Sequence, residues 1–378
     1  MNNPAANHPR ATTHRESAPL NTREPTTLNP ELDVKFNGVI QYIDSTRMIA
    51  SRGFQLFESL DSGTSWTSLG TAPVAMHHRC RSWIPLLRRF CRAQIGNVVL
   101  LDESNLLVFA ADKVWRYDLE TRRFLHSAPL VGRRPLTICR TGDSELYYGE
   151  YRRNFERTPT HLWRTGDSGK SWEAVHRFTN IRHVHGVFHD PFTDSLWVTT
   201  GDDDEECGLW QSTDGGVTMT RIIGGSQQFR AVHLLFREDA IYFGSDTPRE
   251  KNHLYRLHRK DHSVERLCEV DNSVFFATDV GGTMCFSTAC EQSDINRSPY
   301  ASVWASTNGD DWSPIVRMTK DGWPSPWLQH GHIRFPTGIQ RPDRLCFTTM
   351  ATNLHETVLC VGMNAEQAYE TETNSKAA

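Results

Sequence analysis

The sequence predicts an all-β fold built from repeated units of about four short strands. Runs rich in β-branched and aromatic residues alternate with clusters of Gly, Asp and Asn, and long amphipathic helical periods are scarce. A pattern of an aliphatic residue, an aromatic residue, any residue and often Ser or Thr recurs along the chain. The aromatic residues of its six copies are Phe57, Trp115, Trp163, Trp210, Tyr255 and Trp304.

The spacing of these copies predicts the architecture. Successive aromatic positions are separated by 58, 48, 47, 45 and 49 residues. A period near 47 fits four strands per unit, which is the repeat of a β-propeller blade. The 329 residues from 34 to 362 hold about seven such periods. We therefore expect a single β-propeller of seven four-stranded blades, with six as the alternative count. The segment 34–40 is expected to pair with the last blade and close the ring.

A turn rich in Asp, Asn and Gly follows the repeated strand in four places, at 59–66, 165–172, 212–219 and 306–312. The Asp or Asn side chain can close such a turn by accepting backbone N–H groups, and Gly supplies the positive φ. These motifs resemble the Asp-box of the sialidase-like (BNR-repeat) β-propeller superfamily. The resemblance implies a propeller whose Asp-box turns lie on the face opposite the functional site. It therefore implies a structural role for Asp61, Asp167 and Asp214.

The two ends of the chain differ in composition from the repeated region. Residues 1–30 contain five Pro and five Thr without an apolar stretch, so we expect a disordered arm and no signal peptide. The propeller is expected to span 31–363, with a flexible tail at 364–378. Nine Cys occur without a CxxC pair, which favours reduced thiols and a cytoplasmic location.

Composition and charge exclude several classes of protein. The 23% charged and 38% hydrophobic residues provide enough apolar material for a core. The longest apolar run has six residues, at 106–111, whereas a membrane-spanning helix needs about 20. An insertion at 79–92 holds five Arg with Trp and Phe, which is typical of a partner-binding patch. The net charge of -4 argues against nucleic acid as that partner.

Three of the expected second strands end in a small residue followed by an acid. The segments are Gly149-Glu150-Tyr151, Gly201-Asp202 and Gly244-Ser245-Asp246. Equivalent positions in consecutive blades should lie close together, and clustered carboxylates can serve as acid, base or nucleophile. The candidate catalytic residues from these loops are Glu150, Tyr151, Asp202 and Asp246. The alternative is that each carboxylate closes its own turn.

Two His-x-His motifs open expected innermost strands. His183 and His185 begin one strand, and His330 and His332 begin another. Because side chains alternate along a strand, both imidazoles of a pair face the same side. Such pairs suit a divalent metal or a general base, and the alternative is a structural role. We count His183 and His185 among the catalytic candidates. The sequence requires no cofactor but allows a divalent metal.

Arginines near the same loops are candidate ligands for a negatively charged substrate. Guanidinium groups pair well with carboxylate or sulfate, although ordinary surface ion pairing is the alternative. The expected substrate-binding residues are Arg152, Arg230, His330, His332 and Arg334.

These candidates together predict a carbohydrate-active enzyme, either a glycoside hydrolase or a polysaccharide lyase. The expected ligand is an anionic oligo- or polysaccharide bound at the channel mouth. The chain lacks the Arg-Ile-Pro segment of true sialidases ahead of the first Asp-box. The alternative function is a non-catalytic Asp-box propeller that binds a glycan or a protein partner. Fold alone does not decide between them.

Overall fold

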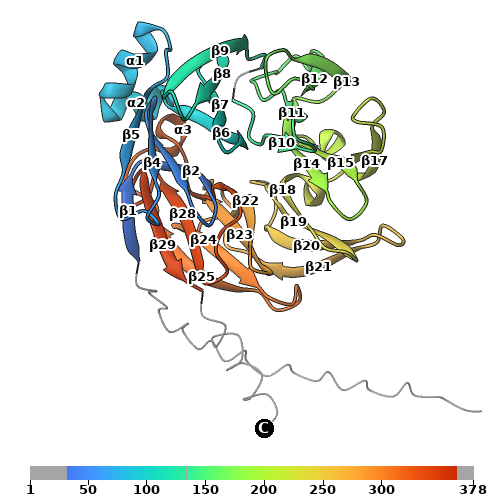
Figure 1. The fold of residues 1–378 in the computed structure, drawn as a ribbon. Coiled ribbons are helices and arrows are strands. Elements are labelled where there is room, and N and C mark those ends of the chain that lie inside the picture. The colour runs from blue at the N-terminus through green and yellow to red at the C-terminus, as the bar shows by residue number, and fades with distance from the viewer. Residues whose placement is uncertain (1–31, 133, 364–378) are drawn as a thin grey trace, which may run out of the picture.

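The computed structural model describes residues 32–132 and 134–363, which form β-sheets arranged in a ring in chain order (Figure 1). The expected arm at 1–30 and the expected tail at 364–378 lie outside the described residues. In the described part of the chain, no helix combines the length and apolar character needed to cross a membrane.

Five sheets each contain four consecutive antiparallel strands. The first group consists of β2 (Val39–Ile43), β3 (Met48–Arg52), β4 (Gln55–Ser59) and β5 (Thr67–Thr71). The second consists of β6 (Ile95–Asp102), β7 (Asn105–Ala110), β8 (Lys113–Asp118) and β9 (Arg123–Pro129). The third consists of β10 (Cys139–Arg140), β11 (Leu146–Gly149), β12 (Thr160–Thr165) and β13 (Glu173–Phe178). The fourth consists of β14 (His183–Asp190), β15 (Ser195–Gly201), β16 (Gly208–Ser212) and β17 (Thr220–Gly224). The fifth consists of β18 (Ala231–Phe236), β19 (Ala240–Ser245), β20 (His253–His258) and β21 (Val264–Glu269).

The remaining strands, apart from β27, form one eight-stranded sheet. Its first group is β22 (Ser273–Val280), β23 (Thr283–Cys290), β24 (Tyr300–Ser306) and β25 (Ser313–Thr319). Its second group is β26 (Gly331–Arg334), β28 (Arg344–Met350), β29 (Thr357–Gly362) and β1 (Asp33–Asn37). A two-residue contact between β23 and β26 joins the groups. The short β27 (Thr337–Gly338) pairs with β2 in the first sheet.

The N-terminal strand closes the ring. We expected one strand over 34–40, but the structure has two strands here, β1 and β2, separated by Gly38. β1 pairs antiparallel with β29, and β2 begins the first sheet. A Cβ atom at Gly38 would lie 2.5 Å from the Ser51 carbonyl oxygen, so only glycine fits where the chain crosses between sheets. This pairing covers an edge of the last group of strands.

The apolar core lies between neighbouring sheets. One cluster joins Ile49 and Leu56 of the first sheet to Val98 and Leu106 of the second. A second cluster joins Phe109 of the second sheet to residues of the third. Buried apolar area is the main stabilising contribution in such an arrangement. The first strands of several groups face the inside of the ring, where they line a cavity.

The Asp-rich turns share one hydrogen-bond pattern. In the first copy, the Ser59 hydroxyl donates to Asp61 at 2.8 Å, and Asp61 accepts the Ser65 N–H at 2.9 Å. The same bonds recur around Asp167 and Asp214. The backbone N–H of Ser65 and the hydroxyls of Ser65 and Ser59 lower the pKa of Asp61 to about 2. These carboxylates therefore serve their own turns.

The Arg-rich insertion forms two helices, α1 (Met76–Trp83) and α2 (Pro85–Cys91), on the outside of the ring (Figure 1). Arg88 forms an ion pair with Glu356, and Arg89 forms one with Asp321, each at 2.5 Å. A third short helix, α3 (Ser325–Leu328), contacts α2. Two of the five insertion arginines therefore attach the helices to connecting segments of the eight-stranded sheet, one after β25 and one before β29.

The expectation that all cysteines are reduced is wrong for one pair. Cys346 and Cys360 lie directly opposite each other on β28 and β29 and form a disulfide. The other seven cysteines are free. Sequence spacing could not reveal this pair, because strand register alone brings the two residues together.

We expect thiol titration of the unfolded, unreduced protein to find seven free thiols, and nine after reduction. Closing a loop of about 15 residues is worth about 3 kcal/mol, so a reductant should lower the free energy of unfolding by about that amount. Urea unfolding with and without reductant measures the difference. A Cys346→Ala/Cys360→Ala variant should be insensitive to reductant. Nine free thiols before reduction would contradict this expectation.

Candidate functional site

A cavity of about 280 Å³ lies at the centre of the ring. The first strands of several groups line it, including β2, β6, β14, β18, β22 and β26. Eight of the residues expected from the sequence are in its wall: Tyr151, His183, His185, Asp202, Asp246, His330, His332 and Arg334. The remaining three, Glu150, Arg152 and Arg230, do not line the cavity.

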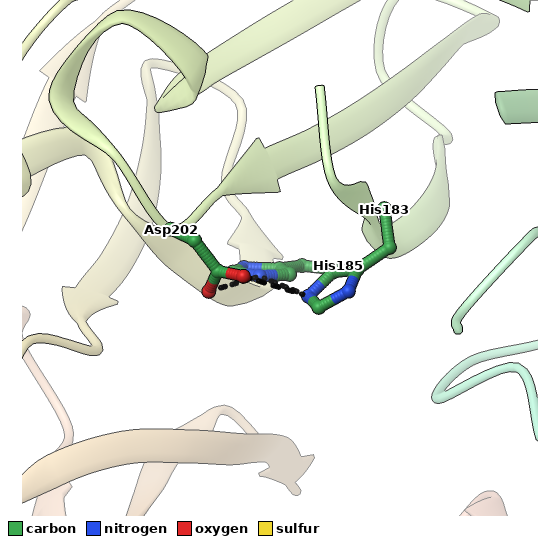
Figure 2. Close-up of side chains that lie close together, drawn as sticks. All are labelled: His183, His185 and Asp202. Carbon is green, nitrogen blue, oxygen red and sulfur yellow. Dashed lines mark hydrogen bonds and ion pairs between the residues drawn. The ribbon is translucent and has the colours of Figure 1, made fainter. Parts of the chain in front are cut away.

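The histidines of β14 form a tightly fixed pair (Figure 2). The Nδ1 atom of His183 is 3.1 Å from the carbonyl oxygen of Arg152, and Nδ1 of His185 is 3.1 Å from that of Ala231. The two Nε2 atoms are 3.1 Å apart. Burial, together with the neighbouring His185, lowers the pKa of His183 to about 3. His183 is therefore uncharged at neutral pH.

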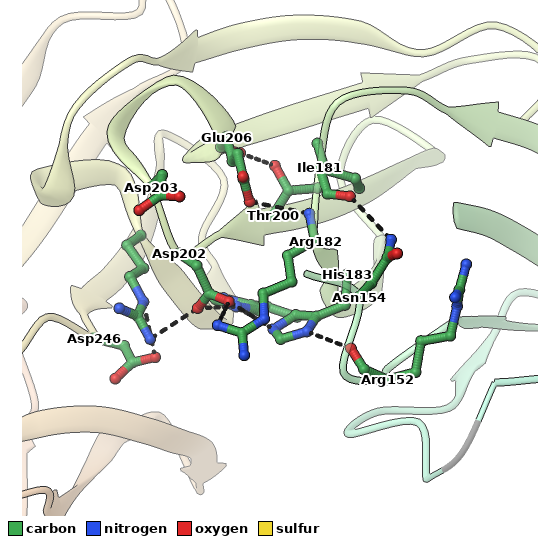
Figure 3. A network of polar contacts seen from close by, with 12 residues as sticks. Arg152, Asn154, Ile181, Arg182, His183, Thr200, Asp202, Asp203, Glu206 and Asp246 are labelled. Carbon is green, nitrogen blue, oxygen red and sulfur yellow. Dashed lines mark hydrogen bonds and ion pairs between the residues drawn. The ribbon is translucent and has the colours of Figure 1, made fainter. Parts of the chain in front are cut away.

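Asp202 follows β15 directly and faces this histidine pair (Figures 2 and 3). Its oxygens lie 3.6 Å from Nε2 of His183 and 3.8 Å from Nε2 of His185. It also pairs with Arg182 at 2.8 Å and Arg230 at 3.0 Å. Burial favours the neutral acid, but His185 and Arg230 outweigh it, so the pKa of Asp202 lies well below its ordinary value. Asp202 is ionised under all ordinary conditions.

Arg230 lies behind the cavity wall, between two carboxylates. It contacts Asp202 on one side at 3.0 Å and Asp246 on the other at 3.4 Å. Burial would lower the pKa of Arg230, but Asp246 and Asp202 raise it above its ordinary value. We expected Arg230 to bind substrate directly. The structure places its guanidinium between the two acids, where it pairs with both.

Glu150 and Arg152 belong to a separate network. Glu150 is buried and accepts a hydrogen bond from the Trp163 indole at 2.9 Å. Its other oxygen lies 3.4 Å from Arg152. Arg152 also donates to the Thr158 hydroxyl and the Pro159 carbonyl. The contacts of Glu150 therefore fit a structural role in its own loop better than a catalytic role.

Glu291 is a cavity residue that sequence reasoning missed. It follows the end of β23 directly, as Asp202 follows β15 and Asp246 follows β19. Burial and the nearby Asp246 carboxylate raise the pKa of Glu291 to about 7. The available signal was this position after the second strand of a group. In this segment Cys290 precedes the acid, whereas Gly or Ser precedes it in the three segments predicted from the sequence.

Two cavity arginines make no ion pair with any residue in 32–132 or 134–363. Arg334 donates to the Gly96 carbonyl at 2.7 Å and to the Asn97 side chain at 2.8 Å. Burial without a neighbouring carboxylate lowers the pKa of Arg334 to about 10. Arg92, which the sequence did not single out for the site, caps α2 and is exposed at the cavity. Both guanidinium groups are available to an anionic ligand.

The second His-x-His motif lies in another part of the wall. His330 precedes β26 and His332 lies within it. Nδ1 of His332 is 2.9 Å from the His330 carbonyl oxygen, and burial lowers the pKa of His332 to about 3. Nε2 of His330 is 3.9 Å from Glu291. In the described ranges, only His183, His185 and Asp202 place three metal-ligating atoms within 4.8 Å of one another.

Comparison with known proteins supports the fold and leaves the family open. No sequence-family model matches, and no curated protein matches. An oligogalacturonate lyase in complex with manganese is similar in structure, with a TM-score of 0.61, 13% identity, and coverage of 90% of this chain and 92% of that chain.

Two further solved structures are also similar. A chain of the mitotic checkpoint complex has a TM-score of 0.58 and 11% identity, with 96% of this chain and 99% of that chain covered. The extracellular domain of the one-component system BT4673 from B. thetaiotaomicron has a TM-score of 0.55 and 12% identity, with 88% and 40% covered. The chain is therefore an all-β protein with a fold of the β-propeller type.

Proposed function

We propose that this protein cleaves a glycosidic bond in an anionic glycan bound at the central cavity. One observation carries the proposal. The same cavity wall holds guanidinium groups that have no carboxylate partner in the described chain and a carboxyl group whose pKa is about 7.

The arginines define the charge of the ligand. A buried cation without a counter-ion is costly unless something anionic compensates it. Arg334 meets this condition, because its two described partners are neutral oxygen atoms. A carboxylate of a uronate residue would accept charge-assisted hydrogen bonds from Arg334 and Arg92.

Two carboxyl groups of the wall have widely separated pKa values. Asp202 stays ionised, whereas Glu291 is half-protonated near pH 7. Such a separation assigns acid and base roles in many enzymes. Glu291 is the group suited to exchange a proton with the substrate at neutral pH. Tyr151, whose ring centre is 4.3 Å from that of His183, keeps its phenolic proton because burial raises the pKa of Tyr151.

Further support for the substrate class comes from the similarity to a lyase whose name gives an acidic oligosaccharide as its substrate.

The proposal includes seven four-stranded blades, a count supported by five four-stranded groups and the two groups of the large sheet. It also includes the propeller boundaries 31–363 and membership of the Asp-box superfamily. A cytoplasmic location stays a prediction, although disulfides are more common in oxidising compartments. The proposed cleavage does not require a metal.

Incubation of the purified protein with uronate-containing oligosaccharides, and with sialosides for comparison, tests the proposal. Ultraviolet-absorbing unsaturated products would identify a lyase, and new reducing ends without that absorbance would identify a hydrolase. We expect turnover of a uronate substrate and none of its neutral counterpart. Binding without turnover on the whole panel would favour the non-catalytic alternative and overturn the proposal.

A further inference from the structure

The orientation of both β14 imidazoles is fixed by backbone carbonyl groups. Nδ1 of His183 faces the Arg152 carbonyl oxygen and Nδ1 of His185 faces the Ala231 carbonyl oxygen, each at 3.1 Å. A carbonyl oxygen can only accept a hydrogen bond, so both Nδ1 atoms carry the hydrogen. In a neutral imidazole, the Nε2 atom then presents a lone pair.

With both Nδ1 hydrogens directed at carbonyl groups, the two Nε2 atoms face each other across 3.1 Å (Figure 2). The Asp202 carboxylate lies at 3.6 Å from one Nε2 atom and 3.8 Å from the other. Three electron-rich groups facing a common point repel one another in a poorly hydrated site. A cation at that point, either a proton or a metal ion, removes the repulsion.

We propose that Nε2 of His183, Nε2 of His185 and the carboxylate of Asp202 bind one divalent transition-metal ion. Two ligand atoms that each lie about 2.1 Å from the same ion are at most about 4.2 Å from each other. The three separations between the Nε2 atoms and the Asp202 oxygens all fall within this limit. Two imidazoles with one carboxylate suit zinc, manganese, iron or cobalt, whereas calcium and magnesium prefer oxygen ligands.

The surroundings of the three ligands resemble the outer shell of a metal site. Carbonyl oxygens that accept from the distal imidazole nitrogen orient metal-binding histidines. Gly201 leaves the necessary room, because a Cβ atom there would lie 2.7 Å from the His185 ring. Arg182 and Arg230 orient Asp202, and their positive charges also weaken cation binding. Asp246, which pairs with Arg230, offsets part of that charge.

All three ligands line the central cavity, so an ion held by them would keep open positions facing a bound ligand. The metal site and the proposed glycan cleavage are separate claims, because the contacts that define the metal site do not involve Arg334, Arg92 or Glu291. Metal binding is measured without substrate, so either claim can fail while the other stands.

The full chain should be treated with a chelator, dialysed, and titrated separately with zinc, manganese, cobalt and magnesium chlorides. We expect one equivalent of zinc, manganese or cobalt to bind and to raise Tm, because an ion that binds only the folded state stabilises it. Magnesium should bind more weakly. Bound cobalt should also give a visible absorption band from its nitrogen ligands.

Two variants locate the site. His183→Ala should weaken binding at least about tenfold, since even outer-shell changes cost that much. His189→Ala is the matched control, because His189 lies on the same strand and pairs with Asp194 outside the cavity. Binding by His183→Ala equal to that of wild type would overturn the inference. So would the absence of binding by wild-type protein for every metal tried, which would assign the central charge to a shared proton. If His183→Ala fails to fold, the metal titration of the wild-type protein still tests the inference.

Discussion

Glu291→Gln should abolish a loss of folding stability that the wild-type protein undergoes as pH rises from about 5 to 8. The folded pKa of Glu291 is about 7, against 4.5 for an ordinary glutamate. Between these values the folded protein holds a proton that the unfolded chain has released. Stability is therefore greatest below the unfolded pKa and falls as pH rises through the folded pKa. The shift corresponds to roughly 3 kcal/mol, and glutamine removes it by staying neutral.

Urea unfolding of wild type and Glu291→Gln at several pH values measures this difference. Glu238→Gln, which alters an exposed glutamate, is the matched control and should follow wild type. If a glycan substrate is found, Glu291→Gln should also lower turnover by about 10²- to 10⁴-fold, the usual contribution of a general acid or base. Parallel stability profiles for wild type and Glu291→Gln would show that Glu291 titrates normally.

Arg334→Met should weaken binding of a uronate oligosaccharide by about 10- to 100-fold, because a hydrogen bond to a charged group is worth about 1.5–3 kcal/mol. It should leave the free energy of unfolding within about 1 kcal/mol of wild type. The variant loses two hydrogen bonds to neutral oxygens, but it also removes the cost of a buried charge that has no ion pair in the described part of the chain.

Calorimetric titration and thermal melts of Arg334→Met provide the two measurements. Arg344→Met is a suitable control, since Arg344 pairs with Asp33 away from the cavity. It should bind the oligosaccharide as wild type does. Unchanged binding by Arg334→Met, or a large loss of stability, would assign Arg334 a structural role.

Part of the candidate site could be predicted from local sequence. Strand alternation placed His183 and His185 on the same side, and the structure has their Nε2 atoms in contact. The position after a second strand predicted Asp202 and Asp246, and both line the cavity. These inferences depend on period-two geometry and on an approximate repeat, which neighbouring residues encode.

Glu150 occupies an equivalent position after a second strand, but it does not line the cavity. Its side chain meets the Trp163 indole and Arg152, which come from its own group of strands and the following loop. The sequence predicted that Arg230 lies near the candidate acids, and in the structure its guanidinium forms ion pairs with Asp202 and Asp246. A charged side chain is free to bind a ligand only if no other side chain of the protein pairs with it. Those partner residues lie elsewhere in the chain, so a short sequence motif does not reveal them.

The sequence by itself determined that this protein is an all-β repeat of the propeller type, because strand periodicity, turn chemistry and repeat spacing are local properties. It also determined which strands would carry the histidines and several of the acids. Only the tertiary structure decided which charges are neutralised, since that depends on contacts between strands far apart in the chain. Such contacts decide the raised pKa of Glu291 and the Cys346–Cys360 disulfide, and they leave Arg334 without an ion pair among residues 32–132 and 134–363.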